Sequence, residues 1–511
     1  MTWQLMPLMP FMAAGLAVVC ETLLGFRLLW RGRRWLAWLG IGLFAVSASW
    51  LVIAYPALTT AANALVAACS MFNLTRVIRS RSAENFLFRS VNTTGLWLAC
   101  AHILIFSLIA ARWQQPSLLA GLVAVLAVSQ LALAIGLWLS AGKQIKVSNL
   151  SFDKAMQKPI ATNHLPSITV AVPARNEGPR LAACLDAILA SDYPKLEVIV
   201  LDDHSGDRTP EIVRGYAHAG VRFVRGDQPA PGWLPKNQAY DRLAKEASGK
   251  FILFCGVDVR LAPHSLQVLE AAMHTKRKSM MTILPQNRHL RYVPAIQAMR
   301  YYWETAPPRR LFRRPPVLSS CWMIERAELQ KAGGFAASKQ SIAPEAHFAR
   351  HALRRRAYGF IRSNLALGVT TEKDAKDQRE TAVYMRYPQL HRRPELVMLT
   401  SLAELLLLLG PLFTIPWALA AGFGWYDGVV LAAVSLASLL VNMTTFARVQ
   451  RLIFPKASFS NACLAFLPAI ASDIWLLNLS MYKYEFSEVI WKDRPVQEPV
   501  MQVIPHLPQL K

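Results

Sequence analysis

The sequence has few charged residues and few cysteines. Only 17% of its 511 residues are charged, whereas 53% are hydrophobic, and this composition excludes an ordinary soluble protein. The seven cysteines are scattered and form no Cys-x-x-Cys pair. Their spacing excludes the usual zinc sites and favours structural thiols in a reducing compartment. The length suits a membrane part plus one water-soluble domain.

Acidic residues are scarce beside basic ones. The chain has 32 Asp and Glu against 56 Lys and Arg, for a formal net charge of +24. In a soluble protein this charge would suggest a nucleic-acid partner, but the sequence has no recognisable nucleic-acid-binding motif. The basic residues cluster beside apolar runs, so we expect anionic phospholipid headgroups as the partner and no nucleic acid. The clusters lie at residues 31–34, 76–89, 309–314 and 392–393.

Long apolar runs dominate residues 1–143 and predict an N-terminal transmembrane bundle of about five spans. The first run is too long for a signal peptide and lacks a small-residue cleavage signal, so we expect it to be retained. Basic loops between the runs would lie in the cytoplasm by the positive-inside rule. With five spans in the cell (inner) membrane, the next domain is cytoplasmic; if the marginal third run does not cross, this orientation fails. The runs are 7–30, 35–55, 57–73, 94–111 and 117–140.

Short apolar runs alternate with helix-patterned stretches in residues 167–378, after a predicted polar linker at 144–166. The strand-like runs are bounded by turn signals, and the stretches between them carry apolar residues at helical spacing. This alternation predicts an α/β fold, Rossmann-like, with a mainly parallel sheet. The strand-like runs are 168–172, 196–201 and 251–255.

Acidic residues follow each of these three runs: Glu177, then Asp202 with Asp203, then Asp258. The carboxyl ends of parallel strands share one edge of a sheet, and ligands bind there. We therefore expect the carboxylates to converge on a crevice suited to a nucleotide diphosphate and its divalent cation. The alternative, that each acid is only a solvated turn residue, is less favoured for three clusters together with Lys236.

Four motifs resemble those of the glycosyltransferase family 2 nucleotide-sugar domain, which has the GT-A fold. The resemblance is greatest to membrane-bound, lipid-modifying members, including the hopanoid-associated and carotenoid glycosyltransferases. It covers about residues 167–394 and leaves the first 150 residues outside. It implies a nucleotide-sugar donor, a lipid acceptor and Mg²⁺ or Mn²⁺ as cofactor. The motifs are Pro173-Ala-Arg-Asn-Glu177, Asp202-Asp-His-Ser205, Gly232-Trp-Leu-Pro-Lys236 and Val257-Asp258.

The resemblance also implies roles for single residues. Pro173 belongs to the nucleotide-sugar-binding motif. Glu177 and one of Asp202 or Asp203 would hold the base and ribose, because a carboxylate accepts charge-assisted hydrogen bonds from them. Lys236 would neutralise the charge of the diphosphate as a point cation. The alternative for Lys236 is a lysine on a solvated turn.

Two positions depart from the family pattern. The usual Asp-x-Asp is here Gly256-Val257-Asp258, so Asp258 alone would bind the divalent cation, and we expect a weakened metal site. The usual Glu-Asp pair is here Pro344-Glu345, which makes Glu345 the candidate general base that activates the acceptor hydroxyl. A compatible alternative makes Glu345 a helix-start carboxylate that interacts favourably with the helix dipole.

Three residues are weaker candidates for contacts with the acceptor or the diphosphate. Trp322 would line the acceptor pocket, or belong to a packed strand. Gln389 and Arg392 lie in a predicted interfacial helix, residues 379–394, which mixes aromatic and basic side chains. Their segment resembles the Gln-x-x-Arg-Trp element of processive relatives, with arginine in place of tryptophan. Arg392 would contact the diphosphate, or snorkel along the membrane surface.

Apolar runs return at residues 395–482 and predict C-terminal transmembrane segments, followed by a tail at 483–511. Asp473 and Asn478 make the last run polar enough for an interfacial or re-entrant segment. The tail contains Trp491-Lys-Asp-Arg494, which resembles the terminal Trp-Lys-Gly-Arg signature of the family. Its side of the membrane depends on whether the last run crosses.

The sequence thus favours a membrane-integral inverting glycosyltransferase that moves a sugar from a nucleotide donor to a lipid acceptor. Two alternatives remain. One is a non-catalytic relative that acts as a membrane scaffold or lipid-binding protein, because two motif positions have changed. The other is a processive polysaccharide synthase.

Overall fold

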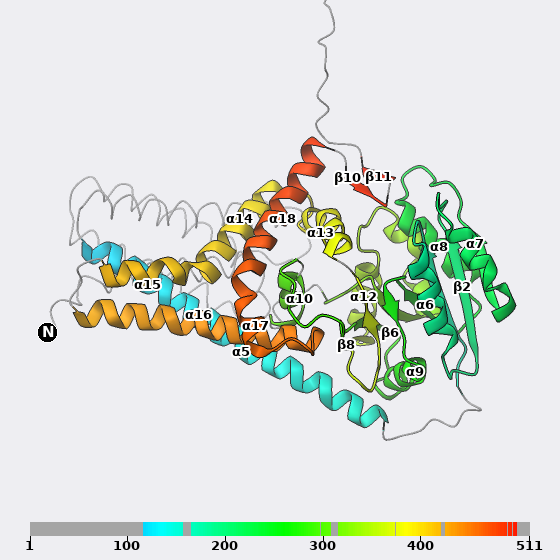
Figure 1. The fold of residues 1–511 in the computed structure, drawn as a ribbon, viewed down its shortest axis with the longest axis horizontal. Coiled ribbons are helices and arrows are strands. Elements are labelled where there is room, and N and C mark those ends of the chain that lie inside the picture. Colours follow the sequence, from blue (N-terminus) through cyan, green and yellow to red (C-terminus); the bar gives the residue numbers. More distant parts are fainter. Residues whose placement is uncertain are drawn as a thin grey trace, which may run out of the picture. The chain divides into compact units, whose positions relative to one another are not determined.

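The computed structural model describes residues 116–156, 165–296, 298–307, 315–373, 375–420, 425–487, 489–492 and 494–497 (Figure 1). The predicted spans 7–30, 35–55, 57–73 and 94–111 lie outside these residues. The chain divides into two compact units. Unit 1 comprises residues 1–135, 308–313 and 410–439, and unit 2 comprises the remainder.

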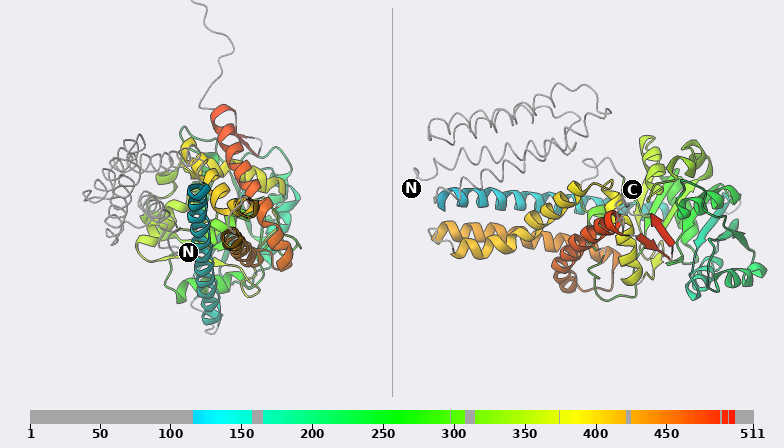
Figure 2. Two further views of the ribbon diagram at one scale, coloured as in Figure 1. Left: turned by 90° about the vertical axis from the view of Figure 1, so that its left-hand side faces the viewer. Right: turned by 90° about the horizontal axis from the view of Figure 1, so that it is seen from above.

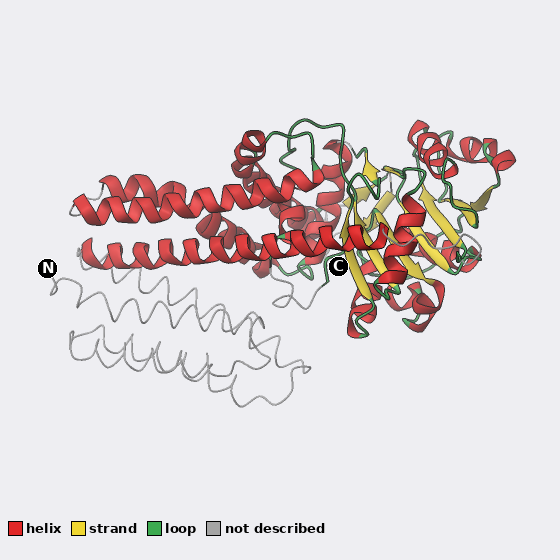
Figure 3. Ribbon diagram, turned by 90° about the horizontal axis from the view of Figure 1, so that it is seen from below, coloured by secondary structure: helices red, strands yellow, loops and turns green. Residues whose placement is uncertain are grey.

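A seven-stranded mixed sheet forms the centre of the α/β domain in unit 2, with strand order β3-β2-β1-β4-β7-β6-β8 (Figure 3). Strands β3, β2, β1 and β4 run parallel, β7 is antiparallel to both of its neighbours, and β8 is parallel to β6. The predicted α/β domain with a mainly parallel sheet is confirmed. The strands are β1 (Ile168–Ala174), β2 (Leu196–Asp202), β3 (Val221–Arg225), β4 (Phe251–Cys255), β6 (Met280–Leu284), β7 (Cys321–Glu325) and β8 (Tyr358–Arg362).

Helices cover both faces of this sheet because successive side chains of a strand point to opposite faces. Val170 and Val172 of β1 pack with helices α6 and α9, whereas Ala171 between them packs with α8 and α12. Proline in the first turn favours the start of α6, α7 and α8. The helices of the domain are α6 (Pro179–Leu189), α7 (Thr209–Gly215), α8 (Pro235–Glu246), α9 (Ser265–Thr275), α10 (Ala298–Thr305), α11 (Arg326–Lys331) and α12 (Glu345–Arg354).

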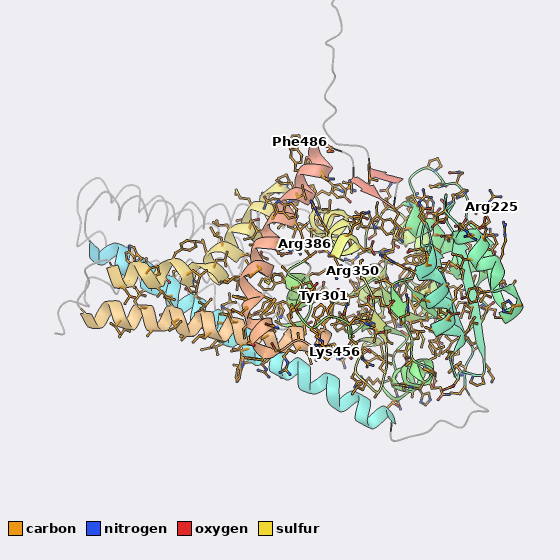
Figure 4. The ribbon with its side chains drawn as sticks, in the orientation of Figure 1. Arg225, Tyr301, Arg350, Arg386, Lys456 and Phe486 are labelled. Carbon is orange, nitrogen blue, oxygen red and sulfur yellow. The ribbon has the colours of Figure 1, made fainter. Side chains whose placement is uncertain are left out.

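Helix α13 (Ala375–Gln389) packs along α18 (Phe466–Phe486) in unit 2. The two helices are joined by an ion pair between Arg386 and Asp473 (Figure 4). The Tyr484 hydroxyl donates to the carbonyl of Tyr384 at 2.8 Å, and Asn478 donates to Ser401 of α14 (Pro394–Glu404) at 3.0 Å. The polar residues of the last apolar run therefore have partners within the protein.

Among the residues that the structure describes, four helices are long and apolar enough to cross a membrane: Val123–Lys143, Pro394–Leu419, Gly428–Ile453 and Phe459–Phe486. In unit 1, α15 (Gly410–Ala420) and the first part of α16 (Trp425–Ile453) run side by side (Figure 2). Their Thr414 and Ser435 hydroxyls are 2.9 Å apart. Large apolar side chains on α5 (Pro116–Met156), α15 and α16 are exposed, as expected for lipid contact. They include Val128, Trp138, Leu139, Phe413, Leu419, Val430, Leu436 and Leu440.

The helix boundaries differ from the sequence expectation at three places. Helix α5 (Pro116–Met156) continues through residues 144–156, which we expected to be a polar linker. Helix α13 begins at Ala375, within the range assigned to the α/β domain. Helix α18 extends to Phe486, into the predicted tail. These residues are polar and have moderate helix propensity, so an apolar pattern does not mark the true ends.

Candidate functional site

The acidic residues lie at the carboxyl ends of three neighbouring strands. Glu177 follows β1, Asp202 ends β2 and Asp258 follows β4. Because β1 pairs with both β2 and β4 in parallel, these ends share one edge of the sheet. This placement agrees with the predicted crevice and is the usual ligand-binding edge of a parallel sheet.

The Asp258 carboxylate is positioned by a segment far away in the sequence. The Thr371 hydroxyl donates to Oδ2 of Asp258 at 3.0 Å, and the backbone N–H of Glu372 donates to the Asp258 carbonyl at 2.9 Å. Strands β5 (Val259–Arg260) and β9 (Thr370–Thr371) pair alongside these bonds. Thr371 could not be found by sequence reasoning, because nothing in its local pattern indicates a contact with Asp258.

Gly256 lies directly beside the Asp258 carboxylate. A Cβ atom at this position would lie 2.7 Å from Oδ1 of Asp258, which is closer than carbon and oxygen approach without displacement. The backbone N–H of Gly256 also donates to Ser320 at 2.7 Å. The missing side chain therefore leaves room for the Asp258 carboxylate in its observed position.

Lys236 lies in the first turn of α8, directly after Pro235. Its ammonium group is 5.4 Å from the centre of the Tyr240 ring. Burial lowers the pKa of Lys236, whereas the charges of Glu345 and Asp258 raise it. The Lys236 ammonium is therefore close enough to both carboxylates for their charges to change its pKa. The residue lies in a helix and not on a solvated turn.

Glu345 is the first residue of α12 and is completely buried. Its charge raises the pKa values of Lys236, Tyr240 and Tyr384, for each of which burial has the largest effect. The helix-start interpretation of Glu345 agrees with the structure. This position also places its carboxylate among the groups around Lys236, so the two interpretations are compatible.

Asn237 connects the lysine helix to the segment that leads to Glu345, and sequence reasoning missed it. Its side-chain N–H groups donate to the carbonyls of Ser338 and Lys339, both at 3.0 Å, and of Ser341 at 2.7 Å. The backbone N–H of Leu234 also donates to the Lys339 carbonyl at 3.0 Å. The buried Asn237 amide and the Leu234 N–H therefore both hold the segment before Glu345 against the start of α8.

Replacing Asn237 with alanine removes these bonds and deprives the Ser341 carbonyl of this donor, whereas the Lys339 and Ser338 carbonyls still accept from the backbone N–H groups of Leu234 and Ser341. We expect Asn237→Ala to lower the free energy of unfolding by about 1–3 kcal/mol, which is the usual cost of a buried polar group that loses its partner. Thermal unfolding of the purified protein measures this loss. Gln238→Ala is the control, because Gln238 bonds only the exposed loop carbonyl of Gln228 and N–H of Ala230; equal losses for both variants would contradict the role of Asn237.

The predicted nucleotide carboxylates each have a partner in the protein. Asp202 is buried and accepts from the backbone N–H of Ser205 at 3.3 Å. Asp203 lies 3.7 Å from the His204 imidazole, and Glu177 forms an ion pair with Lys492. Pro173 lies within β1, opposite Leu201 of β2.

Trp322 and Arg392 both pack against aromatic side chains. Trp322 is fully buried in β7 and stacks on Phe254, with ring centres 4.3 Å apart, which favours the packed-strand alternative over an acceptor contact. Arg392 is exposed, and its guanidinium lies 5.3 Å from the ring centre of Tyr484 on α18. This contact favours an arginine that extends along the membrane surface over one that binds the diphosphate. Gln389 is the last residue of α13.

Helix α10 adds groups that the sequence did not indicate. Burial raises the pKa of Tyr301, the charge of Arg300 lowers it and the charge of Asp258 raises it. Arg300 also lowers the pKa of Lys236, as does Lys373. The groups around Lys236 thus include further cations, which suits a doubly charged or more highly charged ligand.

The donor set at Asp258 fits a divalent cation held jointly with a substrate. Within the described residues there is no group of three or more His, Cys, Asp or Glu side chains that could hold a metal ion by themselves. Mg²⁺ in nucleotide sites is usually bound through one or two carboxylates plus substrate phosphates. The Asp258 carboxylate lies among cationic groups that suit a diphosphate, and this arrangement meets that requirement.

Comparison with known proteins agrees with the motifs. Residues 169–331 match the model of glycosyl transferase family 2. These residues are a glycosyl transferase family 2 domain. The matched range begins at the second residue of β1 and takes in the acids after β1, β2 and β4 together with Lys236, but it ends before Glu345.

Two of the relatives found for this domain are named as glycosyltransferases. The 4,4'-diaponeurosporenoate glycosyltransferase of Staphylococcus haemolyticus is 33% identical over 147 residues, which cover 28% of this chain and 37% of that protein. The ceramide glucosyltransferase of Komagataella phaffii is 28% identical over 116 residues, which cover 20% of this chain and 23% of that protein. The chain thus spans well under half the length of both relatives.

Among solved structures, the chain resembles the mannosyltransferase PcManGT from Pyrobaculum calidifontis in complex with GDP-Man and Mn²⁺. The sequence identity is 16% and the TM-score 0.42, over 69% of this chain and 99% of that one.

Proposed function

We propose that the protein is a membrane-integral, inverting glycosyltransferase that transfers a sugar from a nucleotide donor to a lipid acceptor. The observation that carries the proposal is the arrangement of Asp258 after β4, Lys236 at the start of α8 and Glu345 at the start of α12, in which the charges of both acids raise the pKa of Lys236. Cation, metal-ligand carboxylate and candidate base are the groups that a transfer from a nucleoside diphosphate requires.

The donor half of the site binds the nucleotide and stabilises its diphosphate. Glu177 and Asp202 or Asp203 accept hydrogen bonds from the base and ribose. Asp258, oriented by Thr371, would hold Mg²⁺ or Mn²⁺, and a bound cation would supply positive charge at the diphosphate. Lys236 provides a second positive charge from the start of α8, and the amino-terminal end of that helix favours an anion.

The acceptor half of the site removes one proton. Glu345 takes the proton of the acceptor hydroxyl as its oxygen bonds to the anomeric carbon. The bond from that carbon to the diphosphate oxygen breaks on the opposite face, so one displacement inverts the configuration. The nucleoside diphosphate leaves with the electron pair. General-base help of this kind contributes about 10² to 10⁴-fold to the rate.

A lipid acceptor at the inner face of the cell membrane agrees with the apolar helices. The chain carries four candidate membrane helices with exposed apolar side chains, and two relatives are named for diaponeurosporenoate and ceramide. Helix α13 packs on α18 and carries Tyr384, whose pKa responds to Glu345. An acceptor head held against α13 would therefore lie near the candidate base.

The last apolar segment, Phe459–Phe486, is better described as interfacial than as crossing. Just before it, the backbone N–H of Asn287 in the α/β domain donates to Ile453 at 2.7 Å. Just after it, Lys492 pairs with Glu177 of the same domain. Because both ends contact the α/β domain, we place this segment along the cytoplasmic membrane surface, with the C-terminal strands on the cytoplasmic side.

Release of nucleoside diphosphate from a panel of nucleotide sugars tests the proposal. The purified protein is assayed in native lipid extract with Mg²⁺ or Mn²⁺. We expect lipid-dependent release from one donor, lowered about 10² to 10³-fold in Lys236→Met, because a charge aimed at the diphosphate is lost. Lys245→Met on the same helix is the matched control, since Lys245 is exposed and pairs only with Asp241.

A wild-type protein that releases diphosphate from no donor, with its fold intact, would contradict the enzyme and favour the non-catalytic relative. Release that yields a polymer would favour the processive synthase. Equal activity of Lys236→Met and Lys245→Met would contradict the role of Lys236.

A further inference from the structure

The segment after α18 returns to the nucleotide edge of the sheet. Residues Val489–Trp491 form β10, which pairs with β11 (Arg494–Gln497), and Lys492 follows β10 directly. We call residues 489–492 the C-terminal strap. Its Lys492 ammonium forms an ion pair with Oε1 of Glu177, across 315 positions in the chain. The sequence placed this region in a tail that resembles the terminal Trp-Lys-Gly-Arg signature of the family, and it gave no partner for Lys492.

Arg175 connects the strap to the end of β2. Its Nε donates to the Lys492 carbonyl at 3.0 Å, and its Nη1 donates to the carbonyls of Asp203 and His204 at 2.6 Å and 2.9 Å. One guanidinium therefore joins the strap to the segment that carries the second nucleotide carboxylate. Lys492 itself has a φ of 50°, a conformation that is uncommon for lysine and that these contacts hold in place.

We propose that the C-terminal strap completes the nucleotide site and that Lys492 is a positioning residue which orients the Glu177 carboxylate toward the donor. This inference rests on the proposed function. Lys492 pairs with Oε1 of Glu177, and the described residues form no hydrogen bond or ion pair with Oε2. This second oxygen can therefore accept a hydrogen bond from a ribose hydroxyl or from an N–H of the base. The backbone N–H of Glu177 is fixed separately by the Thr209 hydroxyl at 3.0 Å.

The strap is anchored on the same apolar cluster that supports the other two parts of the site. Trp491 stacks on Tyr384 of α13, with ring centres 5.5 Å apart and planes at 19°. The cluster around Tyr384 also includes Leu234, two residues before Lys236, and Ile342, three residues before Glu345. The position of Lys492 is therefore tied to the segments that carry the diphosphate lysine and the candidate base.

The opposite arrangement is a strap that blocks the site by occupying Glu177. Two features favour the positioning role. Lys492 pairs with Oε1 of Glu177 and leaves Oε2 as a second acceptor, and the Arg175 bonds to the Asp203 and His204 carbonyls order the β2 end. The two arrangements make opposite predictions, because removal of the Lys492 ammonium weakens nucleotide binding in the first and tightens it in the second.

Binding of UDP and of GDP to the purified full-length protein, measured by calorimetry at pH 7, tests the inference. We expect Lys492→Met to raise the Kd about tenfold or more and Lys492→Arg, which keeps the charge, to stay within a few-fold of wild type. The control is Lys245→Met, which removes an exposed lysine from another acid pair. Thermal unfolding of each variant shows whether it is folded.

A pH series separates positioning by charge from a merely structural role. Burial and the nearby Arg175 charge lower the pKa of Lys492 to about 8, and the charged groups that face it are Glu177 and Arg175. A lysine with a lowered pKa loses its charge as the pH rises through that value. We therefore expect wild-type affinity to fall between pH 7 and pH 9, and the affinity of Lys492→Arg to change less.

Unchanged or tighter binding by folded Lys492→Met would overturn the inference and leave the proposed function intact. A pH response that is identical in wild type and Lys492→Arg would overturn it as well. A wild-type protein that binds neither UDP nor GDP would contradict the proposed function itself, and the inference with it.

Discussion

Glu345→Gln is expected to lower kcat by about 10² to 10⁴-fold and to leave nucleotide binding nearly unchanged. Glutamine has almost the same shape as glutamate but cannot accept the acceptor's proton. Because Glu345 is completely buried at the start of α12, the isosteric change avoids a cavity. Single-turnover transfer and calorimetric nucleotide binding measure the two quantities separately.

Two further variants sharpen this result. Glu345→Asp keeps a carboxylate on a shorter side chain, so partial activity is expected. Glu211→Gln is the matched control, since Glu211 is exposed on α7 and pairs only with Arg208. A folded Glu345→Gln protein with wild-type kcat would show that another group removes the proton or that the protein transfers no sugar.

Asp258→Asn is expected to lower kcat/KM by about 10²-fold or more and to abolish the response to Mg²⁺ or Mn²⁺. An amide lacks the negative charge that holds a divalent cation. The Thr371 hydroxyl can still donate to the remaining oxygen, so we expect the variant to fold. Activity is measured as a function of metal concentration, with and without EDTA.

The metal response distinguishes this account from a charge-only site. Wild-type activity should fall on EDTA treatment and return with added metal, and Asp258→Asn should respond to neither. The single carboxylate beside Gly256 predicts that a high metal concentration is needed. Wild-type activity that is insensitive to EDTA would contradict a metal at Asp258 and would assign the diphosphate charge to Lys236 and the other cations around it.

The sheet and its acidic edge could be predicted because their signals are local. Each apolar run is followed directly by its acid, and the order of strands and helices restricts the topology. The start of α8 was equally visible, because Pro235 precedes Lys236 at the first helical position. These features need only the neighbouring residues, and the structure agrees with them.

The contacts that complete the site could not be predicted, because they join segments far apart in the chain. Thr371 reaches Asp258, Asn237 reaches Ser341 and Lys492 reaches Glu177, and none of these residues belongs to a motif that specifies its partner. Trp322 shows a different limit. The alternation of residues in a strand predicts which side chains share a face of the sheet, but it does not show which face borders a binding pocket. Trp322 lies in the aromatic core.

Transfer of sugar to lipid is the central claim, and its direct measurement is the appearance of labelled sugar in the lipid fraction. Wild-type protein and Glu345→Gln are incubated with the labelled donor and native lipid extract, and the organic phase is analysed by mass and anomeric configuration. We expect one sugar per lipid, with inverted configuration, for wild type and almost none for the variant. Label that stays with the nucleotide, or is released only as free sugar, would contradict a lipid glycosyltransferase.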